Sequence, residues 1–400
     1  MESSRKSRPD TGLPAAPHKA AVPIHAGIAD PALLRSIRQC LQRQPSVRHA
    51  VALSGGADSA MLALHAVSAA RSLGIELSCF HIHHGLLNEA DAWAAHAAQL
   101  ASQLGLPFHM LHVVVPRDSG KGIEGAARQA RYEGLAQLAR SHGVGAILLA
   151  HHQDDQAETV LLRLLRGTGP EGMAAMAGHV VRDGVTYLRP WLDVPRQHIL
   201  DVSARYAAAC GWEPVQDPTN QDADYTRAAV RTLLVPVLEQ RWPAWRTVLG
   251  RHARQAAETG EILAEVAEQD WQALAPAEDG LSFSLPAWRS LSSARQSLAL
   301  RHWLQRLGVK LPTEARLQAW LGQLRRVTHD NQMLLEHEHI EIRCVRSRVL
   351  LQPRQAVSYD ERRRMRVQLR GGGEGQVPDA DRHAPDQENA SATENAPGSC

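Results

Sequence analysis

Six consecutive residues combine glycine, hydroxyl and carboxylate groups between an apolar run and a helical pattern: Ser54, Gly55, Gly56, Ala57, Asp58 and Ser59. A chain that turns from a strand into a helix leaves backbone N–H groups unpaired at the positive end of the helix dipole, so such a turn suits an anion. The two glycines let the backbone approach the anion closely, and the two serines offer hydroxyl donors.

The carboxylate of Asp58 is the unexpected member of this loop, because a carboxylate beside phosphate is unfavourable without a cation between them. We therefore expect Mg²⁺, held jointly by Asp58 and phosphate oxygens. The loop lacks the Gly-Lys-Ser/Thr ending of a Walker A loop, and it is not a dinucleotide fingerprint. An ordinary strand–turn–helix junction stays open as the alternative.

Short apolar stretches alternate with helical patterns around this loop. Strands are expected at 51–53, 75–82, 107–115, 146–150 and up to 189, and helices at 30–42, up to 73, from 88, at 123–141 and at 156–166. This alternation predicts an α/β fold, a doubly wound parallel sheet of Rossmann-like type with helices on both faces. Ligands of such sheets bind beyond the carboxyl ends of the strands.

Three further polar clusters follow the predicted strands, and the topology brings them to the same edge as the glycine loop. In chain order they are His84, the pair Arg128 and Arg131, and the group His152, Asp154 and Asp155. Each has a structural alternative: a solvated helix face, a histidine bonded to backbone, or a helix N-cap with a first-turn acid. Because four clusters lie at four strand ends, a binding site is favoured over four separate structural roles.

The glycine loop resembles the pyrophosphate-binding loop of the ATP-pyrophosphatase superfamily. A larger set of motifs resembles the tRNA(Ile)-lysidine synthetases over about residues 46–250: His81-x-x-His84-Gly85-Leu86, Glu124-x-x-Ala127-Arg128-x-x-Arg131-Tyr132, His152-x-Asp154-Asp155-Gln156-x-Glu158-Thr159, Arg163-x-x-Arg166-Gly167-x-Gly169, Arg189-Pro190, Glu213-x-x-x-Asp217-Pro218-x-Asn220 and Tyr225-x-Arg227-x-x-x-Arg231. Ala228 departs from the pattern, because the family commonly has asparagine there.

The resemblance implies a ligase that uses ATP, isoleucine tRNA with a CAU anticodon, and free L-lysine. O2 of the wobble cytidine is adenylated, pyrophosphate leaves, and the lysine ε-amine displaces AMP at C2. This chemistry requires residues that hold the α-phosphate against the base and screen the charge that develops on pyrophosphate.

The resemblance also implies the roles of the clustered residues. Residues 54–59 bind the pyrophosphate portion of ATP, Asp58 holds Mg²⁺, and His84 and His152 orient or contact the nucleotide. The pair Arg128 and Arg131 binds phosphate or positions the cytidine.

For the two adjacent aspartates, the resemblance implies two roles but does not say which residue has which. Asp154 or Asp155 holds the same metal ion, or orients the attacking ammonium group and accepts its proton. The sequence does not assign these roles between them.

Arginine-rich segments suit a phosphate backbone. The tRNA contacts expected from the motifs are Arg163, Arg166, Arg227 and Arg231. Between residues 227 and 254 six arginines stand against one acidic residue, and between 289 and 326 eight basic residues stand against one. Ordinary solvated helices stay open as the alternative.

The expected organisation has four parts: a disordered segment 1–29, an ATP-pyrophosphatase domain 30–240, a linker helix with a smaller, mostly helical tRNA-binding domain 241–354, and a largely disordered tail 355–400. The further C-terminal domain that many relatives carry is expected to be missing or reduced.

Five scattered cysteines without a Cys-x-x-Cys pair disfavour a disulfide framework, a zinc site and an iron–sulfur site. They also disfavour the tRNA thiolases, the main enzymatic alternative; a non-catalytic ATP- or RNA-binding protein on the same scaffold is the other. No apolar stretch approaches the roughly 18 residues of a membrane span, and no signal-peptide core is present. A cytoplasmic location is expected, and a homodimer is left open.

Overall fold

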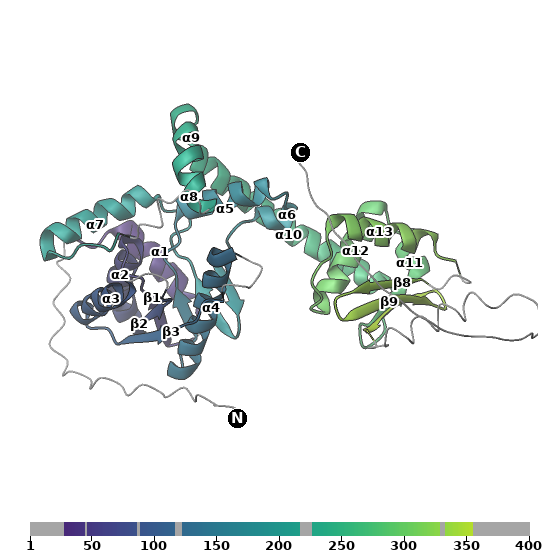
Figure 1. Cartoon of the computed structure of the whole chain (residues 1–400), viewed down its shortest axis with the longest axis horizontal. Coiled ribbons are helices and arrows are strands. Elements are labelled where there is room, and N and C mark those ends of the chain that lie inside the picture. The colour runs from purple at the N-terminus through teal and green to yellow at the C-terminus, as the bar shows by residue number, and fades with distance from the viewer. Residues whose placement is uncertain are drawn as a thin grey trace, which may run out of the picture. The chain divides into compact units, whose positions relative to one another are not determined.

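The computed structural model describes residues 28–44, 46–85, 89–116, 122–216, 226–328 and 333–354 (Figure 1). The chain divides into two compact units, Met1–Val266 and Ala267–Cys400. The helix α10 (Trp245–Ala273) contributes residues to both units. The expected domain limits at residues 29, 240 and 354 stay predictions.

Several expectations fall on parts of the chain outside the described residues. They include the segments expected to be disordered, except that Ile28 and Ala29 are described and Ile28 is buried. The motif positions Leu86, Asp217, Pro218, Asn220 and Tyr225 also lie outside the described residues.

A six-stranded sheet in the order β3-β2-β1-β4-β6-β5 forms the centre of the first unit. Its strands are β1 (Arg48–Ala52), β2 (Glu76–His83), β3 (Phe108–His112), β4 (Ala146–Leu148), β5 (His179–Arg182) and β6 (Val185–Leu188). All neighbouring strands are parallel except β5 and β6. The predicted doubly wound α/β fold is confirmed.

Helices connect the parallel strands and continue beyond the sheet. They are α1 (Pro31–Gln42), α2 (Ala57–Leu73), α3 (Ala90–Leu104), α4 (Gly122–His142), α5 (Gln153–Leu165), α6 (Pro170–Met173), α7 (Arg196–Cys210), α8 (Thr226–Ala229), the π-helical turn η2 (Val230–Leu234) and α9 (Val235–Arg241). Local sequence features explain where several of these helices begin or end. Asp30 caps α1 through the N–H groups of Ala32 and Leu33, and Gly74 ends α2 in the left-handed conformation.

Two apolar cores lie on the two faces of the sheet. One contains side chains such as Leu33, Met61 and Ile199, from α1, α2 and α7, packed with β1 and β2. The other contains Leu135 of α4 packed with residues such as Ile147 of β4. The helix α2 is alanine-rich and buried almost all round, so its N-terminus is held firmly at the end of β1.

The second unit combines helices with an antiparallel sheet in the order β7-β10-β9-β8. Its elements are β7 (Ser282–Ser284), α11 (Leu285–Ser290), α12 (Ser293–Arg306), α13 (Glu314–Arg326), β8 (Leu334–His337), β9 (Ile340–Val345) and β10 (Arg348–Pro353). A core rich in tryptophan, including Trp288, Trp303 and Trp320, holds them together. Among the described residues of both units, no helix has the length and apolar character needed to cross a bilayer.

Candidate active site

The loop between β1 and α2 is ordered by its own hydroxyl groups. Ser59 Oγ accepts from the backbone N–H of Ser54 at 3.1 Å, lies 3.0 Å from Ser54 Oγ, and donates to the carbonyl of Gly56 at 3.1 Å. Gly56 is the N-cap of α2, and no side chain of the described residues caps the helix there. The first N–H groups of a 17-residue helix are therefore left for a ligand.

The two glycines of the loop have different structural requirements. Gly55 has φ +93°, and a Cβ atom there would lie 3.3 Å from Cγ2 of Val215. Gly56 has φ −76°, and its Cβ would meet only Ser54 Oγ at 3.7 Å. We expect Gly55→Ala to lower the free energy of unfolding by on the order of 1–3 kcal/mol. The matched Gly56→Ala change should leave it nearly unchanged. Urea unfolding of both variants measures this, and equal stabilities would contradict the assignment.

Histidines at the end of β2 face the same loop. His81 Nδ1 lies 2.8 Å from the carbonyl of Leu53 and fixes the end of β1. His84 Nδ1 is buried without a partner among the described residues. Burial, together with the positive charge of Arg131 and the neighbouring histidines, lowers the pKa of His84 from its ordinary 6.5 to about 4. His84 is therefore neutral at pH 7.

Acid should destabilise the first unit through its neutral histidines. Burial lowers the pKa of His151 to about 3; the nearby Asp155 opposes this shift, and Arg131 and Arg189 add to it. A histidine whose pKa is lower in the folded than in the unfolded protein stabilises the fold while it is neutral. This contribution is complete above the unfolded pKa near 6.5, and it is lost as the pH falls towards the folded pKa. Between pH 6.5 and 4 the free energy of unfolding should fall less steeply with pH in His84→Gln than in the wild type, by up to about 1.4 kcal/mol per pH unit. Urea unfolding at several pH values tests this, with the exposed His179→Gln as the control; identical slopes would contradict it.

The arginine pair on α4 forms no ion pair within the part of the chain that the structure describes. Neither Arg128 nor Arg131 forms a hydrogen bond or ion pair with a residue that the structure describes, and burial lowers the pKa of both. Their guanidinium carbons lie 5.4 and 5.9 Å from the ring centre of Tyr132. Arg189 donates to the Tyr132 hydroxyl at 3.3 Å. This surplus of positive charge is available for an anionic ligand.

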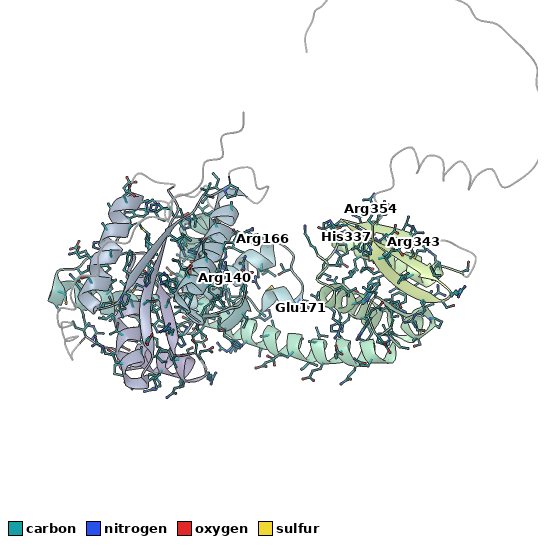
Figure 2. The ribbon with its side chains drawn as sticks, turned by 90° about the horizontal axis from the view of Figure 1, so that it is seen from below. Arg140, Arg166, Glu171, His337, Arg343 and Arg354 are labelled. Atoms are coloured by element: carbon teal, nitrogen blue, oxygen red, sulfur yellow. The ribbon has the colours of Figure 1, made fainter. Side chains whose placement is uncertain are left out.

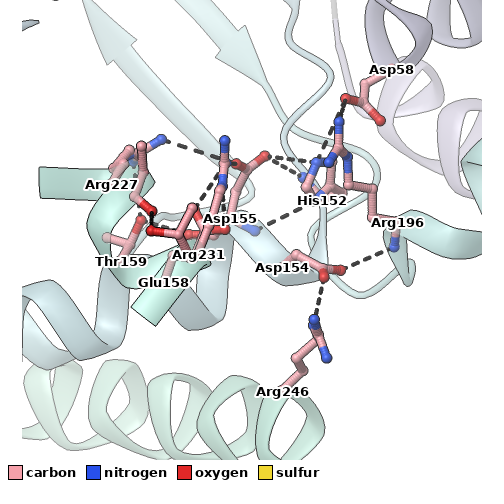
Figure 3. A network of polar contacts seen from close by, with 12 residues as sticks. Asp58, His152, Asp154, Asp155, Glu158, Thr159, Arg196, Arg227, Arg231 and Arg246 are labelled. Carbon is pink, nitrogen blue, oxygen red and sulfur yellow. Dashed lines mark hydrogen bonds and ion pairs between the residues drawn. The ribbon is translucent and has the colours of Figure 1, made fainter. Parts of the chain in front are cut away.

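The start of α5 places a second set of polar groups near the loop (Figure 3). His152 and Asp155 form a reciprocal capping box, in which His152 N donates to Asp155 Oδ2 at 3.2 Å. His152 Nε2 also lies 3.8 Å from Asp58 Oδ2. Burial opposes ionisation of Asp155, but the nearby His152, His151 and arginines together lower its pKa. Asp155 is therefore an anion at neutral pH, linked through His152 to the glycine loop.

The neighbouring Asp154 points to different partners. Asp154 Oδ1 accepts from the backbone N–H of Arg196, the first residue of α7, at 3.1 Å. Asp154 Oδ2 accepts from Arg246 Nε of α10 at 2.5 Å. Arg246 also pairs with Glu239 at 2.6 Å. Asp154 thus joins three helices, whereas Asp155 faces the interior of the site.

Two arginines after residue 225 also reach α5. Arg231, in the π-helical turn η2, donates to both oxygens of Glu158 at 2.7 and 2.9 Å and to Asp155 Oδ1 at 3.3 Å. Arg227 is held more loosely, 3.4 Å from Thr159 Oγ1 and 4.0 Å from Asp155 Oδ1. π-Helical turns are frequent at functional sites, and here the turn carries Arg231.

Comparison with known proteins identifies the family. Residues 30–238 match the PP-loop domain family, and residues 283–350 match the TilS substrate binding domain family. The tRNA(Ile)-lysidine synthase of Bordetella bronchiseptica is 54% identical over 82% of this chain and 97% of its own length. The chain belongs to the tRNA(Ile)-lysidine synthase family. The synthase of Bordetella pertussis is 57% identical over 76% of the chain and 95% of that protein. That of Ralstonia nicotianae is 46% identical over 69% of the chain and 58% of that protein.

The structure of this tRNA(Ile)-lysidine synthase family member brings most of the expected residues together. Around the strand ends lie the loop Ser54–Ser59, His84, Arg128, Arg131, His152, Asp154, Asp155, Arg227 and Arg231. Two expected tRNA contacts are placed differently: Arg163 donates to the carbonyl of Gly172 at 2.5 Å, and Arg166 is an exposed residue at the end of α5 (Figure 2). Their role, like that of the other site residues, stays a prediction.

Sequence reasoning missed two arginines at this site, Arg196 and Arg246. Arg196 Nη2 lies 3.4 Å from Asp58 Oδ2, and Arg246 binds Asp154. Arg196 carries no local signal beyond a helix start after Pro195. Arg246 was counted only within the basic segment expected to face tRNA.

Proposed function

We propose that this protein ligates lysine to C2 of the wobble cytidine in isoleucine tRNA with a CAU anticodon, and releases AMP and pyrophosphate. Membership of the tRNA(Ile)-lysidine synthase family, with matches to both its PP-loop and its substrate-binding families, is the observation that carries this proposal. The compartment that supplies tRNA, ATP and free lysine together is the cytoplasm, and we propose it as the location. A homodimer stays a prediction.

The loop residues fit ATP and a magnesium ion. Asp58 Oδ1 is buried without a hydrogen-bond partner, and no three His, Cys, Asp or Glu side chains in the described residues converge as a metal site. A single carboxylate that shares the ion with phosphate oxygens is a common arrangement for Mg²⁺. In this proposal Asp58 holds the ion, which neutralises charge on the departing pyrophosphate when bound. The uncapped N–H groups of α2 bind the same phosphates.

The arginines on α4 fit the reacting centre. Arg128 and Arg131 form no ion pair with a described carboxylate, and Asp155 acts on them only from a longer distance, so they can take up the negative charge of the α-phosphate or of the adjacent tRNA phosphate. His84 and His152 orient the nucleotide, His84 in its neutral form.

Asp155 is the better placed of the two aspartates to receive lysine. It is ionised, and its partners His152 and Arg231 link it to Asp58 and Glu158 of the site. The partners of Asp154 lie on α7 and α10. We assign Asp155 to orienting the lysine ammonium group and accepting its proton before attack at C2. Asp154 then has a positioning role.

Transfer RNA would be held through its phosphates by arginines that are loosely held or exposed. Arg227 has its nearest described partners at 3.4 Å or more, and Arg166 is exposed. Arg231 is already bound to Glu158, so its expected contact with tRNA would require exchange of that partner.

The proposed activity is tested with purified protein, ATP, Mg²⁺, radiolabelled lysine and an isoleucine tRNA transcript with a CAU anticodon. Label should enter the RNA with equal amounts of AMP and pyrophosphate formed, and a methionine tRNA transcript is the matched control. AMP formation with no transfer of lysine would overturn the proposed ligation and indicate another member of the superfamily.

A further inference from the structure

Arg196 lies beside the glycine loop although it is distant from it in sequence. It is the first residue of α7, and its backbone N–H is fixed by Asp154 Oδ1 at 3.1 Å. Its guanidinium extends in the other direction and lies 3.4 Å from Asp58 Oδ2 (Figure 3). The side chain of Asp58 is 24% exposed and that of Arg196 is 43% exposed, so both are accessible to a ligand.

The contact between Arg196 and Asp58 is incomplete. Charge-assisted N–H···O bonds are normally about 2.7–2.9 Å long, and arginine commonly pairs with a carboxylate through two parallel bonds. Here there is one contact of 3.4 Å, and both Asp58 Oδ1 and Arg196 Nε are buried without a partner among the described residues. Buried polar atoms are normally satisfied, so these two fit a ligand that supplies both an acceptor and a cation.

We propose that Arg196 binds the terminal phosphates of ATP and that, without nucleotide, its guanidinium takes the place of the divalent cation on Asp58. The inference rests on the proposed function, because its ligand is the pyrophosphate portion of ATP. Arg196 presents a planar set of N–H donors that matches phosphate oxygens. When nucleotide and cation bind, Arg196 moves from Asp58 to phosphate and Asp58 is released to the cation, so each charge keeps a partner of opposite sign.

This exchange predicts effects of opposite sign from one substitution. In Arg196→Gln the positive charge that competes for Asp58 is lost, so a divalent cation alone should bind more tightly. The same variant loses donors to phosphate, so pyrophosphate should bind more weakly. A residue that only supports the fold would weaken both or change neither.

The experiment measures both ligands directly on the full-length protein by calorimetry: Mn²⁺ alone, and pyrophosphate in the presence of Mg²⁺. We expect Arg196→Gln to bind Mn²⁺ several-fold more tightly and pyrophosphate on the order of tenfold to a hundredfold more weakly. Arg196→Lys keeps the charge, so it should bind Mn²⁺ as the wild type does and pyrophosphate with intermediate affinity. The matched control is Arg205→Gln on the same helix, where the exposed Arg205 lies 3.9 Å from Asp30; it should change neither affinity.

Two results would overturn the inference: unchanged pyrophosphate affinity in Arg196→Gln, or weaker binding of both ligands in a variant that melts at the wild-type temperature. A wild-type protein that binds no pyrophosphate with Mg²⁺ would instead count against the proposed function itself. The two failures are therefore distinguishable.

Discussion

Replacing Asp58 by asparagine is expected to reduce lysidine formation by on the order of a hundredfold or more, because the neutral amide no longer shares a cation with phosphate. The fold should survive, since Asp58 is a first-turn residue of α2 whose Oδ1 has no partner among the described residues. Loss of the favourable interaction with the helix dipole costs only about 0.3–1 kcal/mol. Lysine incorporation and the melting temperature, measured on the same preparation, test both statements.

The control for Asp58→Asn is Asp201→Asn, the same change at an exposed position of α7. It should leave both the rate and its dependence on Mg²⁺ unchanged. Near-normal turnover of Asp58→Asn at low Mg²⁺ would remove the metal role assigned to this carboxylate.

Much of the fold was predictable because its signals are local. The Asp30-Pro31 start of α1, the apolar stretches of β1 and β2 and the glycines that end helices all act within a few residues. The edge strand β5 was missed because its four residues, His179–Arg182, are all exposed and show no alternation. Nothing in the local pattern distinguishes such a strand from a polar loop.

The site was predictable to the extent that topology determines it. From the rule that ligands bind at strand ends, the loop, the α4 arginines and the start of α5 were expected at the same edge of the sheet, and the structure places them there. The partners of those residues were not predictable, since Arg196 and Arg246 return to the site only through tertiary packing of α7 and α10.

In the basic segments, too, the sequence alone does not show how much charge is free to bind a ligand. Counted along the sequence, residues 289–326 carry a large excess of arginine, but acids from outside the segment neutralise part of it. Arg295 pairs with Asp270 and Arg306 pairs with Glu268. Arg289 instead donates to the carbonyl of Leu324, in the last turn of α13, and to that of its C-cap residue Val327. The charge available to a tRNA phosphate backbone is therefore smaller than the sequence count, and only the fold reveals which residues carry it.

The adjacent aspartates should differ sharply when each is changed to asparagine. Asp155→Asn is expected to lower lysine transfer by on the order of a hundredfold or more, because the group that orients the ammonium and accepts its proton is lost. The asparagine oxygen can still accept from His152 N, so the cap of α5 is kept. Release of pyrophosphate, which reports adenylation of the cytidine, and affinity for ATP should change much less than lysine transfer, because adenylation does not use the lysine amine.

Asp154→Asn is the matched comparison, one residue away and on the same helix turn. Its amide oxygen can keep the bond to the Arg196 backbone, while the ion pair with Arg246 is lost. We expect a loss of less than about tenfold in lysine transfer and an unchanged KM for lysine, since Asp154 does not contact lysine in this proposal and Arg246 keeps its ion pair with Glu239. Single-turnover assays that separate pyrophosphate release from lysine transfer measure this contrast. If Asp154→Asn instead raised the KM for lysine while Asp155→Asn did not, the two roles would have to be exchanged.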